Sequence, residues 1–145
     1  MRSTNYPCPN ADRGKHSFTY SVYCGNEDFE TEVLKHAESI NKPITAVCGE
    51  SETGALKEYS FLSCDKENIV IDAVKVAESG KDIIVRLYEA TNETCECSLQ
   101  FGFYVKKAWS CDLLENVERE ISTDGNGVRL QVKPFEIITL RLEII

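Results

Sequence analysis

The sequence lacks an excess of positive charge and lacks long hydrophobic runs. Of its 145 residues, 16 are Lys or Arg and 24 are Asp or Glu, so the formal net charge is −8. Nucleic-acid binding requires a basic surface, and this balance therefore argues against a nucleic-acid partner. It also gives no reason to expect attraction to an anionic membrane. No apolar run approaches the roughly 20 residues of a membrane-spanning helix.

Residue patterns that carry common catalytic chemistry are also scarce. The chain has two histidines, His16 and His36, and neither lies in a recognisable Ser/His/Asp or Cys/His context. No glycine-rich loop of the phosphate-binding kind is present. The acidic residues are scattered over turns and strand edges, so a glycosidase-type carboxylate pair cannot be picked out. We therefore predict no catalytic residue and no metal ligand within this chain.

The N-terminal stretch and the cysteines bear on the compartment. The first 15 residues are polar, contain Pro7 and Pro9, and show no apolar region of the kind a signal peptide needs. The seven cysteines are an odd number, whereas a disulfide scaffold favours an even count in a short secreted chain. These features predict a cytoplasmic protein whose thiols are reduced and act mostly as small buried apolar groups.

The N-terminal third carries one strand pattern and one helix pattern. Residues 15–23 alternate between apolar and polar side chains, which predicts a strand with one solvated face. A helix is then predicted to begin after an N-cap at Asp28 and to end near Asn41, before Pro43. Its apolar residues at helical spacing are Phe29, Val33, Ala37 and Ile40.

Almost everything after Pro43 is typical of short strands separated by turns. The expected strands cover residues 44–47, 59–63, 69–76, 83–88, 95–104, 108–114, 128–132 and 136–144. The sequence Asp124-Gly125-Asn126-Gly127 predicts a hairpin turn. The expected fold class is all-β, an antiparallel β-sandwich with one short helix near the N-terminus. Residues 1–42 are expected to be a strand-helix remnant of a preceding β-domain, and residues 43–145 the C-terminal β-sandwich domain.

Cys95 and Cys97 could be half of a metal site. They lie on one face of a predicted strand, about 7 Å apart, which is too far for an easy disulfide. A zinc site would need two more ligands, and no second Cys/His pair has suitable spacing. Because both continue an apolar stripe through Leu99 and Phe101, we interpret them as core thiols.

Three further groups of residues have both a functional and a plain structural interpretation. Asp12 and His16, four residues apart, could form a metal or acid–base pair, but Arg13-Gly14-Lys15 between them indicates a solvated turn rather than a shared helical face. Asn92-Glu93-Thr94 matches a glycosylation pattern that short sequences often match by chance. The third group consists of Trp109, Tyr104 and Tyr88. These side chains could form a sugar-stacking platform or could be half-buried aromatic residues of the sandwich, and we favour the second interpretation.

Several stretches resemble the C-terminal region of glycoside hydrolase family 38 α-mannosidases, in the branch with cytosolic and bacterial members. Together they cover nearly the whole chain, in matching order and spacing. They are Arg2-Ser3, Tyr6-Pro7, Ala11-Asp12-Arg13-Gly14-x-His16-x-Phe18-x-Tyr20, Asn41-x-Pro43, Val70-x-x-x-Val74-Lys75-x-Ala77-Glu78, Ile84-Val85-Arg86-Leu87-Tyr88-Glu89-Ala90, Phe101-Gly102-Phe103, Asp112-Leu113-Leu114-Glu115 and Lys133-Pro134-Phe135-Glu136-Ile137-x-Thr139-Leu140-x-Leu142.

The resemblance implies an enzyme that releases α-linked mannose with retention, using zinc and two aspartates of an N-terminal α/β domain absent here. It therefore implies no cofactor in this chain, with zinc in the catalytic domain. That catalytic domain is the expected partner, and mannose-containing glycans would be met through it; homo-oligomerisation stays open. Asp12 and Arg13 are the residues matched to a loop that closes the sugar site. Met1 falls mid-domain, which suggests an expressed fragment or a truncated reading frame.

The sequence thus predicts a non-catalytic accessory domain that packs on a catalytic domain and shapes the rim of its sugar site. Two alternatives remain at this point. An independent carbohydrate-binding module would need an exposed platform of Trp109, Tyr104 and Tyr88. A plain interaction sandwich would instead show a large apolar face elsewhere.

Overall fold

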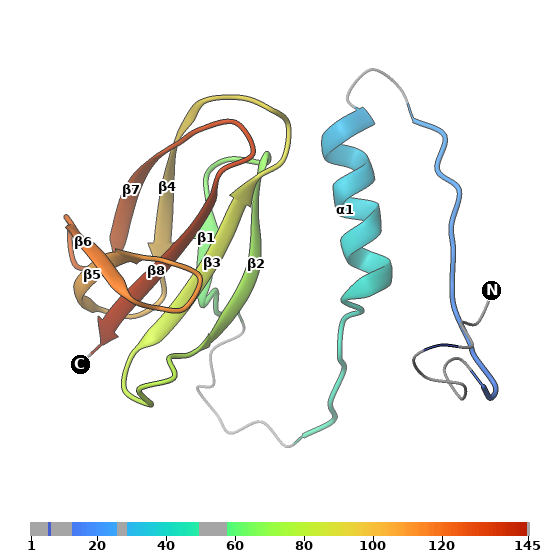
Figure 1. Ribbon diagram of the computed structural model, residues 1–145, viewed down its shortest axis with the longest axis horizontal. Coiled ribbons are helices and arrows are strands. Elements are labelled where there is room, and N and C mark those ends of the chain that lie inside the picture. The colour runs from blue at the N-terminus through green and yellow to red at the C-terminus, as the bar shows by residue number, and fades with distance from the viewer. Residues whose placement is uncertain (1–5, 7–12, 26–28, 50–57, 145) are drawn as a thin grey trace.

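A computed structural model describes Tyr6 and residues 13–25, 29–49 and 58–144. Its elements are one helix and eight strands: α1 (Phe29–Asn41), β1 (Leu62–Cys64), β2 (Ile69–Val76), β3 (Ile83–Glu89), β4 (Cys95–Phe101), β5 (Val105–Cys111), β6 (Val117–Ile121), β7 (Gly127–Val132) and β8 (Ile137–Ile144). The strands form two stacked antiparallel sheets (Figure 1). The predicted β-sandwich is therefore confirmed.

The two sheets differ in width. The smaller has the order β1-β4-β7 and the larger the order β2-β3-β8-β5-β6. Strand β8, at the end of the chain, lies in the middle of the larger sheet between β3 and β5. The C-terminal strand thus completes the larger sheet, and the two halves of that sheet cannot pair without it.

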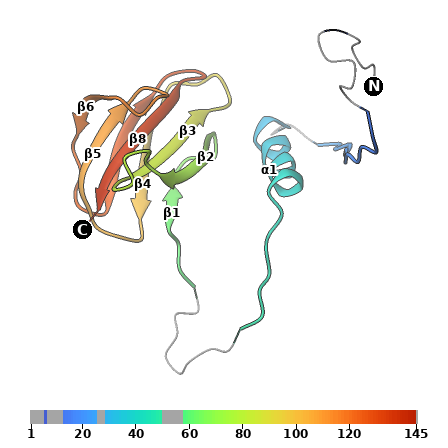
Figure 2. The ribbon, with the colours of Figure 1, turned by 60° about the horizontal axis from the view of Figure 1, so that its bottom comes forward.

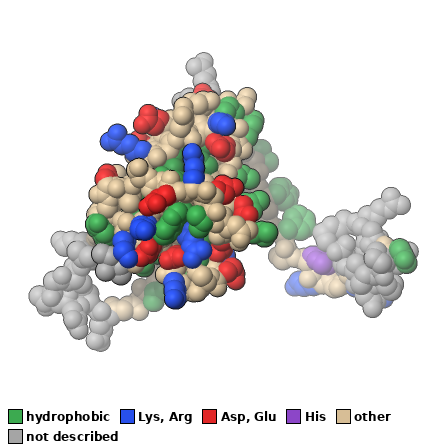
Figure 3. Space-filling view, turned by 60° about the vertical axis from the view of Figure 1, so that its left-hand side comes forward, with side chains coloured by type: hydrophobic (Ala, Val, Ile, Leu, Met, Phe, Trp, Pro, Cys, Tyr) green, Lys and Arg blue, Asp and Glu red, His purple; other side chains and the backbone are tan. Residues whose placement is uncertain are grey.

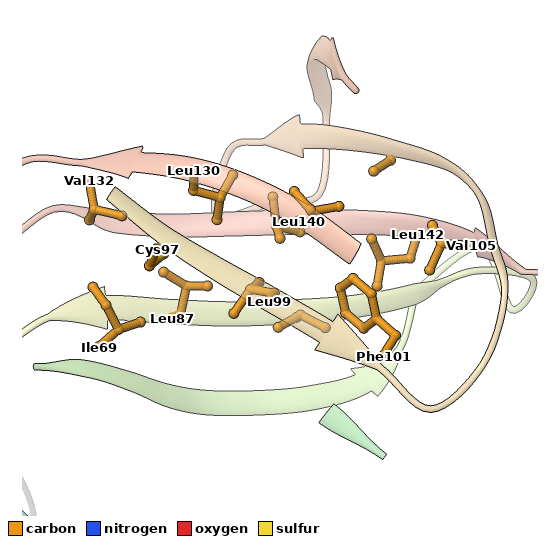
Figure 4. Packing of buried hydrophobic residues seen from close by; sticks show 13 residues of the cluster. Ile69, Leu87, Cys97, Leu99, Phe101, Val105, Leu130, Val132, Leu140 and Leu142 are labelled. Carbon is orange, nitrogen blue, oxygen red and sulfur yellow. The ribbon is translucent and has the colours of Figure 1, made fainter. Parts of the chain in front are cut away.

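The core fills the space between the sheets. Figure 4 shows apolar side chains of β4 and β7 pointing toward those of β3 and β8. Alternation along β4 places Cys97, Leu99 and Phe101 inside, at no more than 4% exposure. A shift of one residue would bring Glu96 and Gln100 into the core, so burial fixes the register of this strand. The core stripe predicted through β4 is confirmed.

Two predicted strands near the N-terminus are wrong. Residues 15–23 and 44–47 belong to no strand, and side chains such as Tyr20 (81% exposed) and Ile44 (99% exposed) face solvent. Alternation favours a strand only where a neighbouring strand supplies hydrogen bonds and a face to pack on. Among the described residues, no strand offers either one to these two segments.

Helix α1 begins and ends where the sequence predicted, although the proposed N-cap, Asp28, lies outside the described residues. At the C-terminal end the side-chain amide of Asn41 donates to the carbonyl of Ala37. The helix stands beside the sandwich without entering its core (Figures 1 and 2). Polar links from the helix and the residue after it to the sandwich include an exposed ion pair, Lys35–Glu67 at 3.0 Å, and a 3.4 Å hydrogen bond from Lys42 to the carbonyl of Asp72. Such surface links stabilise little.

Strand β6 was missed, and the hairpin prediction was only half right. The turn at residues 124–127 forms, but it closes a single bridge between Thr123 and Val128. Beyond that bridge β6 pairs with β5 and β7 pairs with β4, so the chain crosses between sheets at this turn. The extended charge-rich sequence of β6 (VEREI) gives no alternation signal, because most of its side chains are exposed.

Candidate functional site

The residues that were predicted to contact substrate are Asp12 and Arg13. Arg13 is exposed in a segment that is neither helix nor strand, and Asp12 lies outside the described residues. The assignment of both to a sugar-site rim stays a prediction.

The proposed platform of Trp109, Tyr104 and Tyr88 does not form. Trp109 and Tyr88 are half-buried on β5 and β3, opposite Arg141 and Ile137 of β8, while Tyr104 is exposed in the β4–β5 turn. Ring contacts in the described part of the chain involve other aromatic residues. The second interpretation, that of separate sandwich aromatics, fits this arrangement.

A different aromatic cluster lies at the end of the sandwich where β4 turns into β5. The rings of Phe61 and Phe103 are 4.7 Å apart, and those of Phe101 and Phe103 are 5.5 Å apart. The hydroxyl of Tyr59 donates to the carbonyl of Gly102 at 2.7 Å. Tyr59 and Phe61 remain 60% and 43% exposed. We call these residues, with neighbouring Tyr104, the aromatic end.

Gly102 permits the aromatic end to close. A Cβ at this position would lie 2.3 Å from the carbonyl oxygen of Ser60 and 2.6 Å from the hydroxyl of Tyr59. Its amide donates to the carbonyl of Phe61 at 3.0 Å. The Phe101-Gly102-Phe103 motif was noticed in the sequence, but the crossing of residues 58–61 over it carries no local signal.

A groove of about 880 Å³ opens along the other margin of the sandwich, where the narrower sheet leaves the wider one uncovered. Its lining includes Arg119 of β6, Leu130 of β7, Ser110 of β5 and Ile138 of β8. The hydroxyl of Ser110 donates to Glu118 at 3.1 Å. Figure 3 views the molecule from this margin and shows Lys, Arg, Asp and Glu interspersed rather than segregated by sign. The groove therefore has no strong preference for an anion or a cation.

Glu89 is the most completely buried carboxylate of the described residues, at 1% exposure. It accepts hydrogen bonds from the amides of Thr91, Asn92 and Phe135, from the hydroxyl of Thr91 and from the side chain of Asn68, at 2.7–3.0 Å. Burial alone would raise the pKa of Glu89, but these donors, led by the Phe135 amide, lower it to about 2. The carboxylate is a structural anchor whose charge is already satisfied.

A second buried carboxylate, Glu115, has a similar structural role. It forms an ion pair with Lys75 at 2.6 Å and accepts a hydrogen bond from the amide of Glu78 at 2.8 Å. The Lys75 ammonium and then the Glu78 amide hold the pKa of Glu115 below its usual value. The loop after β5 is thereby tied to the end of β2.

Three thiols gather at one end of the core. Cys97 is fully buried and Cys95 half-buried on β4, as predicted, and Cys64 of β1 joins them. Cys64 was not assigned to this group from the sequence, because its strand has only three residues. The side-chain amide of Asn68 lies 3.7 Å from the Cys95 sulfur. Across the described ranges, no group of three or more His, Cys, Asp or Glu side chains could hold a metal ion.

Fold and site together define a β-sandwich domain whose buried carboxylates serve structure. Residues 68–140 match the family model described as glycosyl hydrolases family 38 C-terminal beta sandwich domain. The chain is 31% identical over 148 residues to Alpha-mannosidase 2C1 of Homo sapiens, and 31% identical over 149 residues to Alpha-mannosidase G of Dictyostelium discoideum. The matches cover 98% and 97% of this chain. The chain belongs to glycoside hydrolase family 38, as a C-terminal β-sandwich domain.

The family resemblance inferred from the sequence motifs is therefore confirmed. The chain spans only 14% of the length of each of these two relatives. In the described residues, no helix is long and apolar enough to cross a membrane.

Proposed function

We propose that this chain is the non-catalytic C-terminal domain of an α-mannosidase and that it stabilises a catalytic domain by packing against it. The observation that carries the proposal is the unequal coverage, because nearly all of this chain matches about one seventh of each α-mannosidase. The part of the enzyme outside the matched region would bind zinc, supply the catalytic aspartates and contact terminal α-linked mannose.

The buried carboxylates support a structural role for this domain. A retaining glycosidase needs two carboxyl groups about 5–5.5 Å apart on opposite sides of the scissile bond. Glu89 and Glu115 are the buried acids of the described chain, and each is already bound by backbone amides of its own domain. A carboxylate bound in this way is a poor nucleophile and a poor acid, because its lone pairs are occupied and its pKa is low.

The aromatic end is the proposed contact with the rest of the enzyme. Tyr59, Phe61 and Tyr104 are each 43–60% exposed, which leaves apolar area for a partner to cover. The occupant we infer is the preceding part of the same protein, since the relatives hold most of their length outside the matched region. About half of each side chain is already buried, so covering the rest would stabilise such an interface by roughly 1 kcal/mol for each one, half of the value for full burial.

Deletion of the domain and substitution of residues within it test this proposal in the human relative. Without the region that matches this chain, Alpha-mannosidase 2C1 is expected to be insoluble or inactive on an aryl α-mannoside. Double substitution of its residues aligned with Tyr59 and Phe61 by Ser should lower the melting temperature, whereas substitution of the residue aligned with exposed Glu93 should not. Full activity of the shortened enzyme would refute the accessory role.

The isolated chain is expected to show no α-mannosidase activity, with or without added zinc. Turnover of an aryl α-mannoside that follows the protein through purification would contradict this expectation. An independent carbohydrate-binding module is the second candidate, because the aromatic end is exposed. Titration of the isolated chain with mannose oligosaccharides, followed by tyrosine fluorescence, separates the two: saturable binding that Tyr59→Ser abolishes would favour the module.

We propose a reducing, cytoplasmic location as the setting for this domain. The support is that all six cysteines of the described residues are free, with two of them buried in the core. Disulfides persist in oxidising compartments and are rare in the cytosol.

A further inference from the structure

The pairing of β1 with β4 places two thiols from distant parts of the chain on the same inner face. Cys64 lies opposite Leu99 in this ladder, so Cys97, two residues before Leu99, is its diagonal neighbour. The side chains of Leu62 and Cys64 face the core together, while Ser63 between them is exposed. Cys97 belongs to the buried core and Cys64 packs against that core, so the two thiols are neighbours on the inner face of the β1–β4 pair.

The two thiols differ in access. Cys97 has no exposed surface and lies in the core near Ile69 and Leu87 (Figure 4). Cys64 is only half-buried, in an edge strand of three residues. Cys64 is thus the thiol more accessible to an oxidant, and Cys97 is positioned to react only with Cys64.

The electrostatics reinforce this division. The hydrogen bond from Cys97, aided by backbone amides of Lys66 and Asp65 and opposed by burial, lowers the pKa of Cys64 to about 7. The same contact with Cys64, together with burial, raises the pKa of Cys97. Near neutral pH Cys64 is therefore partly thiolate, the form that reacts with peroxides, while Cys97 keeps its proton.

We propose that Cys64 and Cys97 form a peroxide-responsive thiol pair, in which Cys64 is oxidised first and Cys97 then captures it as a disulfide. In the first step the Cys64 thiolate attacks hydrogen peroxide, a sulfur–oxygen bond forms, the oxygen–oxygen bond breaks and hydroxide leaves. Sulfur loses two electrons and peroxide gains them. In the second step the Cys97 sulfur attacks the sulfenic acid, the sulfur–sulfur bond forms, and the hydroxyl leaves with the thiol proton as water.

The bond would staple β1 to β4. Diagonal partners in an antiparallel pair have Cα atoms about 7–8 Å apart, slightly beyond the usual disulfide range of 4.4–6.8 Å. Closing therefore requires a small movement, which β1 can make because it is short and has one free edge. Cys95 is a poorer partner, since it is two residues further along β4 from Cys64.

The test oxidises the full chain with a slight excess of hydrogen peroxide under native conditions. After blocking the remaining thiols, mass spectrometry of a non-reduced digest should show one crosslink, Cys64 to Cys97, that dithiothreitol reverses. Cys64→Ser and Cys97→Ala should each abolish the crosslink, and Cys95→Ala and Cys111→Ala should retain it. Circular dichroism of each variant confirms that the sheets have formed.

A second measurement does not depend on crosslinking. Alkylation of Cys64 at pH 7 should slow at least about tenfold in the Cys97→Ala variant, because the thiolate fraction falls when its hydrogen-bond donor is lost. Cys111→Ala should leave that rate unchanged. A crosslink to Cys95, irreversible oxidation of Cys64 without any crosslink, or an alkylation rate unaffected by Cys97→Ala would overturn the proposal.

Discussion

Replacement of Glu89 by Gln should destabilise the domain by about 3 kcal/mol at pH 7. The side chain is 1% exposed and accepts five hydrogen bonds that tie Asn68, the turn after β3 and the turn before β8 together. A pKa lowered from 4.5 to about 2 corresponds to roughly 3 kcal/mol of preference for the charged form. Glutamine resembles the protonated acid, because it lacks the charge and turns an amino group toward amide donors.

The pH dependence gives the sharper test. The pKa of Glu89 is lower in the folded state than in the unfolded state, so its contribution is complete above pH 4.5 and is lost as pH falls toward 2. By pH 3 about 2 kcal/mol of the contribution should be gone. Other acids titrate in the same range, and the useful quantity is therefore the difference in stability between wild type and Glu89→Gln, which cancels their effects.

Urea melts followed by circular dichroism at pH 7, 4.5 and 3 measure this difference. Glu93→Gln is the matched control, since Glu93 lies four residues further along and is exposed; it should change stability by less than about 0.5 kcal/mol at every pH. A Glu89→Gln effect below about 1 kcal/mol at pH 7, or one that stays constant from pH 7 to pH 3, would refute the reasoning.

Three further outcomes are expected. Phe101→Ala should cost about 3–5 kcal/mol in urea melts, because Phe101 is 4% exposed between the two sheets; a loss under about 1 kcal/mol would contradict its place in the core. All seven cysteines should alkylate as free thiols when the chain is denatured under non-oxidising conditions, and two or more native disulfides would overturn the cytoplasmic assignment. In the longer enzyme, Arg13→Ala should lower kcat/KM at least about tenfold, or 1.4 kcal/mol, with nearly unchanged Tm; unchanged kinetics would remove Arg13 from the sugar site.

Strands of the sandwich core were predictable because burial of one face produces an alternation of apolar and polar residues along each strand. The bounds of β2 were correct at both ends, and β3, β4, β7 and β8 were correct to within a few residues. In β4 the alternation of Cys97 and Leu99 with Glu96 and Ser98 follows from one face meeting the core. Where neither face is well buried, as in β6, the sequence carried no signal to detect.

The prediction of a strand at residues 15–23 failed for the opposite reason: the alternating pattern is present, but the strand is not. Phe18, Tyr20 and Val22 alternate as a strand should, yet each is at least 75% exposed. The local pattern is real, but a strand also requires a neighbour, and none of the described strands pairs with this segment. The prediction that residues 1–42 belong to a preceding β-domain would account for the pattern, and it stays a prediction.

The candidate site was harder to predict, because its members are far apart in the sequence. The contact between Cys64 and Cys97 follows only from the pairing of β1 with β4. In the same way, Tyr59 reaches Gly102 across more than forty residues. Local periodicity says which face a side chain takes, but it does not say which distant strand lies next to it.

Long-range contacts of this kind also explain how family resemblance can be specific without catalytic residues. The motif containing Glu89 and the motif containing Phe135 meet where the Phe135 amide donates to the Glu89 carboxylate, and Phe135 there adopts a left-handed φ of 54°. Non-glycine residues rarely adopt this conformation, so an anchor is needed to hold it. The motif with Lys75 and the motif ending in Glu115 meet in the same manner, again with a left-handed residue, Glu115 at φ 68°. Four of the motifs that mark the family therefore meet in two polar contacts, the Glu89–Phe135 hydrogen bond and the Lys75–Glu115 ion pair, and each contact joins a turn to a strand.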